Sequence, residues 1–291
     1  MTHQRLPIVT ALLAWLFAAS CWAQSEGPQG KESGANREQV WRVPAEGGAM
    51  LVATLMRPAG DAPVPLAVIS HGSPADEKER PRMSRPIFGP LSGWLLARGY
   101  AVILPLRRGY GETGGKWAES YGSCAKPDYY GAGLRGAADI KSTLDYMRRQ
   151  PFIAPQRTLV IGHSAGGWAT EAFSSLNYPG VAGLISFAGG RGGHQTSAAA
   201  INGNCGPQEL VAASGRYGAK ARQPMLWIYS RNDTFFSAEL SRQMADAYRA
   251  AGGKVDFQSV AAYGQDGHQL VSGPDAVSIW APLVEKFLAG L

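Results

Sequence analysis

The chain has 291 residues, of which 45% are hydrophobic and 17% are charged. This composition excludes an intrinsically disordered chain, and the length suits one large α/β domain or two small ones. The formal net charge is +6, but the basic residues occur in twos and threes that apolar runs separate. Because no long basic stripe is present, we expect no nucleic-acid partner.

The first 23 residues predict a secretory signal peptide. A positive start at Arg5 precedes an almost entirely apolar run over 6–19, and Cys21-Trp22-Ala23 resembles a cleavage site. The run is shorter than the roughly 18 residues that span a bilayer, so we expect no stable membrane insertion. Cleavage after Ala23 predicts an exported protein, periplasmic or secreted. A lipoprotein acylated at Cys21 is the alternative.

Removal of the signal peptide leaves a mature chain with a polar start and two cysteines. Residues 24–38 are rich in Gly, Ser, Gln and charge, which predicts a flexible N-terminus before a domain over 39–291. Cys124 and Cys205 form an even pair in an oxidising compartment, which predicts a disulfide. Two unpaired buried thiols are the alternative.

Apolar runs and turn signals predict an α/β fold, with a mostly parallel central sheet, an antiparallel N-terminal hairpin and helices on both faces. Strands are expected at 40–43 and 50–56 (the hairpin), 66–70, 100–106, 158–161, 181–187, 224–229 and 255–260. Helices are expected at 87–98, 134–149, 168–176, 237–251 and 274–288.

A long glycine-rich loop over 107–133 follows the predicted strand at 100–106. Ligands bind at the carboxyl ends of strands in open α/β sheets, so the aromatic residues Tyr110, Trp117 and Tyr121 are candidates for a substrate pocket. Packing of these rings onto the body of the domain is the alternative. Trp168 and Phe235 are further candidates for the same pocket.

Gly162-His163-Ser164-Ala165-Gly166 lies between a predicted strand and a predicted helix. A serine at such a sharp turn is the G-x-S-x-G signature of a nucleophile, and the glycines avoid steric clashes where the backbones come close. Ser164 is therefore the candidate nucleophile. A glycine-rich turn with an ordinary serine is the alternative.

Two further segments follow the predicted strand at 181–187. The glycine-rich run over 188–194 lacks the Lys-Ser/Thr of a phosphate loop, so nucleotide binding is rejected. The connection that continues from it is too long for a simple turn. We interpret residues 189–223 as a lid insertion, which the predicted disulfide ties to the earlier loop.

Asp233 and His268 each come just beyond a predicted strand, as Ser164 does. Parallel strands bring all three residues to one sheet edge, where His268 can take the serine proton and Asp233 can orient the imidazole. His194, His71 and His163 are rivals for the base. Asp256 and Asp266 are rivals for the acid.

His71-Gly72-Ser73 closes the predicted strand at 66–70. The glycine allows a sharp turn that aims a backbone N–H into the site, where acyl transfer needs two donors for the developing oxyanion. We assign these donors to the amides of Ser73 and Ala165.

These motifs resemble the α/β-hydrolase superfamily, and more narrowly its dienelactone hydrolase and prolyl-oligopeptidase-like branch. The resemblance rests on His71-Gly72-Ser73, the serine turn, Asn232-Asp233, Gly267-His268 and the run at 108–111, Arg-Gly-Tyr-Gly. The chain order of serine, aspartate and histidine matches that fold. Dienelactone hydrolases use a cysteine nucleophile, whereas this turn carries Ser164. The resemblance implies a free-standing exported esterase.

The sequence thus predicts a serine carboxylesterase that acts on a small-molecule ester through an acyl-enzyme intermediate. We expect neither a metal nor an organic cofactor. An amidase or peptidase with the same triad is the first alternative, and an inactive binding protein of the same fold is the second. The sequence indicates no oligomeric state.

Overall fold

The fold is built on one nine-stranded sheet, in a computed structural model that describes residues 25–194 and 202–291. The strands lie in the order β1-β2-β3-β5-β4-β6-β7-β8-β9. Their bounds are β1 Gly27–Ser33, β2 Glu38–Pro44, β3 Met50–Met56, β4 Leu66–Ser70, β5 Ala101–Pro105, β6 Thr158–His163, β7 Val181–Phe187, β8 Met225–Ser230 and β9 Val255–Val260.

The central strands are parallel, from β5 through β4, β6, β7 and β8 to β9. β4, β5, β6 and β8 are buried along their whole length, as the predicted continuous apolar runs require of strands that helices cover on both faces. The carboxyl ends of all six strands therefore meet at one edge of the sheet. The predicted mostly parallel sheet is confirmed.

The N-terminal strands are antiparallel. β2 and β3 form the predicted hairpin, with Trp41 opposite Ala53, and β3 pairs antiparallel with β5. The interpretation of residues 24–38 as flexible is wrong for seven of these fifteen residues, because Gly27–Ser33 pairs with β2 as the outer strand β1. A mostly exposed edge strand needs no apolar side chains, so its polar composition does not distinguish it from a loop.

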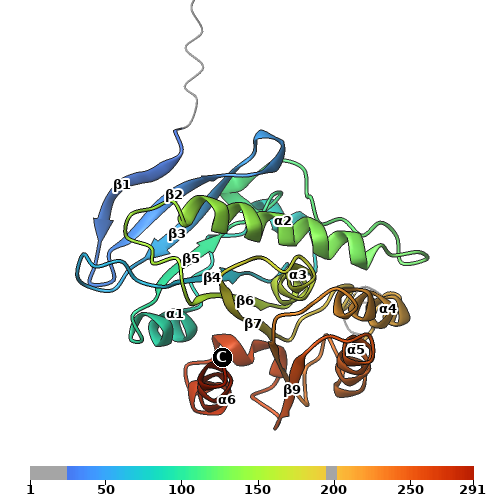
Figure 1. Ribbon diagram of the computed structural model, residues 1–291. Helices are drawn as coiled ribbons and strands as arrows, with labels where there is room; N and C mark the ends of the chain where they lie inside the picture. Colours follow the sequence, from blue (N-terminus) through green and yellow to red (C-terminus); the bar gives the residue numbers. More distant parts are fainter. Residues whose placement is uncertain (1–24, 195–201) are drawn as a thin grey trace, which may run out of the picture.

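Six α-helices of the described residues cover the two faces of the sheet (Figure 1). α2, α3, α4 and α5 pack into the core on one face, and α1 and α6 pack into the core on the other. None of the helices in the described ranges is long and apolar enough to cross a membrane. Their bounds are α1 Gly89–Leu96, α2 Tyr129–Met147, α3 Ala165–Ser174, α4 Pro207–Gly218, α5 Ala238–Ala250 and α6 Val277–Ala289.

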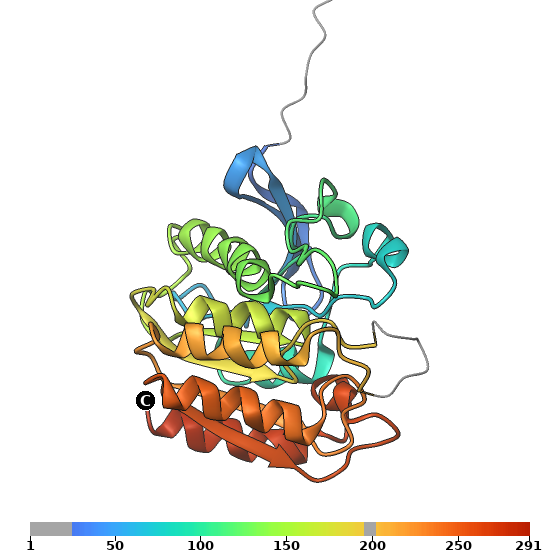
Figure 2. The same ribbon diagram turned by 90° about the vertical axis from the view of Figure 1, so that its right-hand side faces the viewer.

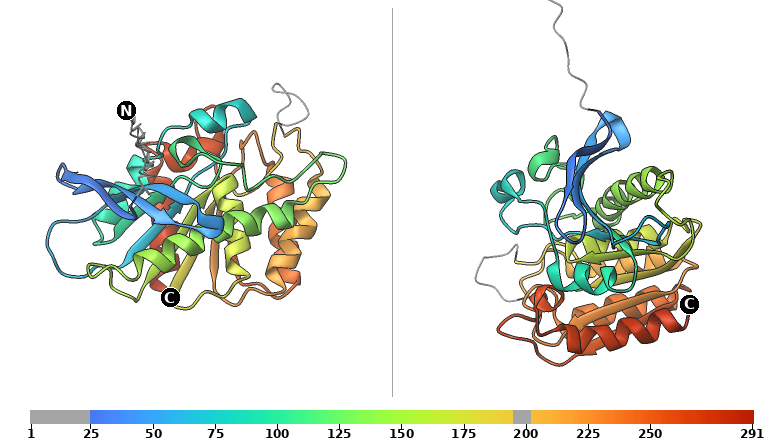
Figure 3. Two further views of the ribbon diagram at one scale, coloured as in Figure 1. Left: turned by 90° about the horizontal axis from the view of Figure 1, so that it is seen from above. Right: turned by 90° about the vertical axis from the view of Figure 1, so that its left-hand side faces the viewer.

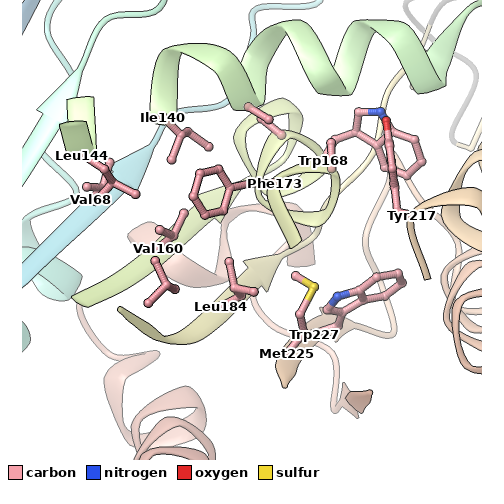
Figure 4. Close-up of a cluster of buried hydrophobic side chains, with 14 of the residues drawn as sticks. Val68, Ile140, Leu144, Val160, Trp168, Phe173, Leu184, Tyr217, Met225 and Trp227 are labelled. Carbon is pink, nitrogen blue, oxygen red and sulfur yellow. The ribbon is translucent and has the colours of Figure 1, made fainter. Parts of the chain in front are cut away.

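Large buried side chains fill the space between the sheet and helices α2 to α5. Figure 4 shows Val160 and Leu184 from neighbouring strands beneath Ile140 and Phe173 from the helices. α2 begins five residues before the predicted start at 134, because the Asp128 carboxylate accepts a hydrogen bond from the Gly131 amide and caps the helix.

The first and last strands, β1 and β9, lie at opposite ends of the sheet. Figure 2 and the right panel of Figure 3 show the blue N-terminal strands far from the red C-terminal elements, as the strand order requires. The arrow of β9 in Figure 2 points to the side of the molecule where two short 3-10 helices lie, η2 (Glu77–Arg82) and η4 (Gly267–Ser272). This side is the carboxyl edge of the parallel strands.

The disulfide joins Cys124 to Cys205, with 5.1 Å between their Cα atoms. It ties the loop before α2 to the segment before α4. The segment interpreted as a lid contains α4, whose buried side chains Leu210 and Tyr217 pack in the same core as α5. α4 is therefore a helix of the main body. Residues 195–201 of the proposed lid lie outside the described residues, as does the predicted signal peptide.

Candidate active site

Ser164 stands alone between β6 and α3, in a backbone conformation that non-glycine residues rarely adopt. Its φ is 54° and its ψ is −121°. Three backbone hydrogen bonds hold it there: its amide donates to Phe187 O (2.9 Å), and its carbonyl accepts from the amides of Trp168 (2.9 Å) and Gly190 (3.2 Å). The surrounding backbone thus holds Ser164 in a strained conformation. Strain of this kind is characteristic of functional positions.

The glycines that flank Ser164 are required by close backbone contacts. A Cβ added to Gly162 would lie 2.1 Å from Gly166 O, and one added to Gly166 would lie 2.0 Å from Ser70 O. Both positions face backbone atoms that cannot move independently. The predicted reason for the G-x-S-x-G spacing, close approach of neighbouring backbones at the turn, therefore holds in the structure.

Asp233 and His268 form a buried pair, with Asp233 shortly after β8 and His268 in η4, which follows β9. His268 Nδ1 lies 3.0 Å from Asp233 Oδ2 and 3.1 Å from Oδ1, and both side chains are almost completely buried. Asp233 Oδ1 also accepts hydrogen bonds from the amides of Phe235 (2.8 Å) and Phe236 (2.9 Å). The carboxylate is therefore fixed, and it orients the imidazole with Nε2 facing away from it.

Contacts from other elements hold His268 in place. The Phe235 ring stacks on the imidazole with 4.1 Å between ring centroids, and His163 Nε2 donates to the backbone oxygen of His268 (2.8 Å). Burial and the neighbouring His268 lower the pKa of His163 to about 3, so His163 is neutral and serves as a hydrogen-bond donor. His163, weighed above as a rival base, instead holds the backbone of His268.

The other rivals are also engaged elsewhere. His71 Nδ1 donates to Gly72 O and its Nε2 accepts from the Arg107 amide (3.1 Å), and burial with the nearby Arg107 cation lowers its pKa. His194 Nε2 donates to Thr234 O (2.8 Å). Asp266 Oδ1 accepts from the amides of Thr234 and His268 (3.0 Å each) rather than from the imidazole. Asp256 lies inside β9.

Two hollows meet at Ser164, and Ser73 to Ala75 and Phe235 line both of them. The histidine hollow holds about 800 Å³ of space, open solvent included, and its other lining residues are His71, Gly72, Met83, Pro86, Phe88, His163, His268, Gln269 and Ser272. The arginine hollow holds about 370 Å³ by the same measure, and its other lining residues are Arg80, Trp117, Tyr121, Ala165, Gly190, Arg191, Gly192, Gly193 and Phe236. Without the open solvent, the cavity volume is about 360 Å³ for the histidine hollow and about 40 Å³ for the arginine hollow. The histidine hollow therefore has the size of a small-ligand pocket, and the arginine hollow admits only a small group.

The predicted donors to an oxyanion stand beside Ser164. Ser73 and Ala165 both line the arginine hollow with the serine, and Ala165 is the first residue of α3. Gly72 brings the chain close to the turn, since a Cβ added there would lie 3.3 Å from Ser164 Cβ. The structure thus brings together the five residues that the sequence predicted for the catalytic triad and the oxyanion donors: Ser164, Asp233, His268, Ser73 and Ala165.

Comparison with known proteins agrees with this fold. The model of the prolyl oligopeptidase family matches residues 91–178. An esterase of Pyrococcus furiosus has a TM-score of 0.60 at 15% identity, over 91% of this chain and 98% of that one. A dienelactone hydrolase-like protein of Klebsiella pneumoniae has a TM-score of 0.57 at 16% identity, over 89% and 100%.

This chain has the α/β-hydrolase fold. The resemblance to the dienelactone hydrolase and prolyl-oligopeptidase-like branch is confirmed at the level of the fold. An acylaminoacyl peptidase of Pyrococcus horikoshii has a TM-score of 0.61 at 17% identity over 88% of this chain, which spans only 42% of that protein. A search of curated protein sequences found no match.

Two of the five aromatic residues predicted to line a pocket lie elsewhere. Trp168 is fully buried beside Tyr217 on the core side of α3, and its Nε1 donates to Tyr129 O (Figure 4). Tyr110 is fully buried against His71. A helix presents successive residues to different sides, so Trp168 faces away from a site that Ser164 faces. Trp117, Tyr121 and Phe235 do line the arginine hollow.

Sequence reasoning missed the arginines of the site. Arg191 follows β7 in the glycine-rich run over 188–194, and Arg80 lies in η2. Beneath them, Glu119 contacts both Arg107 and Arg191 in an ion-pair cluster that is almost fully buried. The position of Arg191 directly after a parallel strand is the one signal that could have identified it, by the rule that served for Asp233.

Proposed function

We propose that this α/β-hydrolase is a serine hydrolase that cleaves carboxylic esters through an acyl-enzyme intermediate. The observation that carries the proposal is the meeting of a strained serine with a buried aspartate–histidine pair, since Ser164 and His268 line the same hollow. A serine hydroxyl is a weak nucleophile near neutral pH and needs such a base. The chain order of the three residues is that of the fold.

In the acylation step, Ser164 Oγ attacks the ester carbonyl carbon while His268 Nε2 takes the hydroxyl proton. Asp233 stabilises the resulting imidazolium and keeps its Nδ1–H directed to the carboxylate. The carbon–alkoxy bond then breaks, and His268 returns the proton to the departing alcohol. The products of this step are an ester of Ser164 and the free alcohol.

The negative charge that develops on the carbonyl oxygen needs donors that are already in position. We assign this role to the amides of Ser73 and Ala165, which flank Ser164 at the hollow. The amino end of α3 adds the partial positive charge of its unpaired amides. In deacylation, His268 activates a water molecule, which attacks the acyl-enzyme under the same donors and releases the carboxylic acid.

Two observations bear on the choice between ester and amide substrates. The structurally similar esterase and dienelactone hydrolase-like protein match this chain over nearly their whole lengths, whereas the chain spans 42% of the acylaminoacyl peptidase. Full-length similarity favours an esterase. The match to the prolyl oligopeptidase family keeps amide or peptide hydrolysis as the second candidate.

The test is hydrolysis of 4-nitrophenyl butyrate and of the matched 4-nitroanilide by the wild type and by Ser164→Ala. We expect the substitution to lower ester turnover by at least about 10⁴-fold, since it removes the nucleophile. Ser278→Ala, an exposed serine on α6, is the matched control and should keep the wild-type rate. Equal rates for Ser164→Ala and wild type would overturn the proposal. Faster turnover of the anilide would favour the amidase.

We also propose that the protein acts after export. The N-terminal sequence has the pattern of a cleavable signal peptide, and the Cys124–Cys205 disulfide is compatible with an oxidising compartment.

A further inference from the structure

The arginine hollow beside Ser164 is positively charged. Two of its lining residues are Arg80 and Arg191, which are only 9% and 4% exposed. Within the described part of the chain, no aspartate or glutamate lines this hollow. Cations are rarely buried without a partner, because desolvation is costly.

The buried cluster under the hollow does not balance this charge. Glu119 contacts both Arg107 and Arg191, so one carboxylate faces two guanidinium groups. Burial opposes ionisation of Tyr110, yet the nearby Arg191 and Arg107 lower its pKa to about 8. A phenol that ionises more easily despite its burial reports a local positive potential. Asp139, another buried carboxylate, is paired with Arg108.

The two arginines of the hollow also retain unused donors. Nε of Arg80 and Nε of Arg191 are buried and have no hydrogen-bond partner among the described residues. The Arg80 guanidinium lies 3.5 Å from the ring centroid of Trp117, with the Arg191 guanidinium 5.7 Å from the same centroid. The carboxylate nearest to Arg80, on Glu77, is 3.9 Å away and largely exposed. Both cations can therefore accept a further anionic partner.

The chemistry of the proposed function decides which part of a substrate reaches this hollow. His268 lines the histidine hollow and must protonate the departing alcohol, so the alcohol lies there. The carbonyl oxygen faces Ser73 and Ala165. The acyl chain is then left with the arginine hollow, where Trp117 and Phe236 can cover its methylene groups.

We propose that the arginine hollow binds an acyl group that carries a carboxylate, so that the substrates are monoesters of short dicarboxylic acids. This inference rests on the proposed esterase function and adds the substrate class. The overall reaction joins one water to the monoester and releases the alcohol and the dicarboxylate, and the newly formed acid gives up one proton. Arg80 and Arg191 bind the remote carboxylate, which does not react.

The first test compares charged and neutral esters of the same acyl length. Monomethyl succinate, glutarate and adipate are measured against methyl butanoate, pentanoate and hexanoate by release of methanol. In the wild type we expect kcat/KM to favour at least one charged ester by about tenfold or more, as a charge-assisted contact implies. Arg80→Gln and Arg191→Gln should each lower that charged-to-neutral ratio by about tenfold or more.

Arg82→Gln is the matched control, because it removes the same charge from the same short helix at a side chain that is 75% exposed. It should leave the ratio unchanged. Arg191 belongs to a buried cluster, so each variant is first checked for wild-type circular dichroism. If Arg191→Gln does not fold, the result for Arg80→Gln decides whether the inference holds. Arg80→Lys keeps the positive charge and should restore part of the charged-to-neutral ratio that Arg80→Gln loses. No preference in the wild type, or a preference that both variants retain, would overturn the inference.

A binding measurement separates this inference from the proposed function. Glutarate is titrated into Ser164→Ala by calorimetry, with pentanoate as the neutral-tail control. If Arg80→Gln weakens glutarate binding but the wild type cleaves no ester, the result would support carboxylate binding in the arginine hollow and reject the proposed esterase function. If the wild type cleaves neutral esters and glutarate does not bind, the result would reject carboxylate binding in the arginine hollow and retain the proposed esterase function.

Discussion

Two buried charged groups lie at the carboxyl edge of this sheet, and they differ in how their charges balance. Asp233 and His268 each follow a strand and form one pair whose charges balance when the imidazole is protonated. In the cluster of Arg107, Glu119 and Arg191, the two arginines also follow strands, β5 and β7, but Glu119 comes from a loop and the cluster keeps an excess cation. The first group suits proton transfer, because the Asp233 carboxylate balances the charge of a protonated His268. The second group suits anion binding, because one carboxylate cannot balance two guanidinium groups.

The largest expected effect tests the first group. Asp233→Asn should lower kcat by about 10⁴-fold, since the amide favours the wrong tautomer of His268. The melting temperature should change little, because the amide oxygen can still accept from Phe235 and Phe236. Steady-state kinetics and calorimetry of one preparation measure both.

Asp266→Asn is the matched control for that experiment, since Asp266 accepts from backbone amides near His268. We expect a far smaller rate loss than for Asp233→Asn. A larger loss at Asp266 would transfer the role of the acid to that residue.

The next effect tests the second group through stability. Glu119→Gln removes the carboxylate that Arg107 and Arg191 share, and it should lower the free energy of unfolding by about 3–5 kcal/mol because buried cations lose their partner. Denaturant unfolding gives the value. Glu112→Gln, which breaks an ion pair with Arg85 at a 61% exposed side chain of the same loop, should cost at most about 1 kcal/mol. Equal losses in the free energy of unfolding for the two variants would mean that the buried ion-pair cluster stabilises the fold no more than an exposed ion pair does.

The smallest effect concerns the covalent tie beside the arginine hollow. Cys124→Ser opens the link to Cys205 and should lower the free energy of unfolding by about 2–4 kcal/mol, because the unfolded chain gains freedom over a separation of 81 residues. We expect looser substrate selectivity with the triad still active. Peptide mapping without reduction checks the bond, and two thiols that alkylate freely in the native exported protein would contradict it.

The candidate triad could be placed from the sequence because each member follows a parallel strand: Ser164 directly follows β6, Asp233 lies shortly after β8, and His268 lies in η4 after β9. Ser164, Asp233 and His268 need only the rule that parallel strands end at one edge. The same rule could not show that Trp168 turns toward Tyr217 in the core, since that depends on which face of α3 meets α2 and α4. β1 was missed for a related reason, because its pairing with β2 leaves most of its side chains in solvent.

The sequence by itself determined the fold class, the serine turn and the pairing of Cys124 with Cys205. These features depend on local rules, such as periodicity, the space around a glycine and an even number of cysteines. Only the tertiary structure decided that Arg80, Arg191 and Glu119 share one place, because loops from three parts of the chain must meet there. Their charges act over short distances in a medium of low dielectric constant, so their effect depends on final positions that no local pattern encodes.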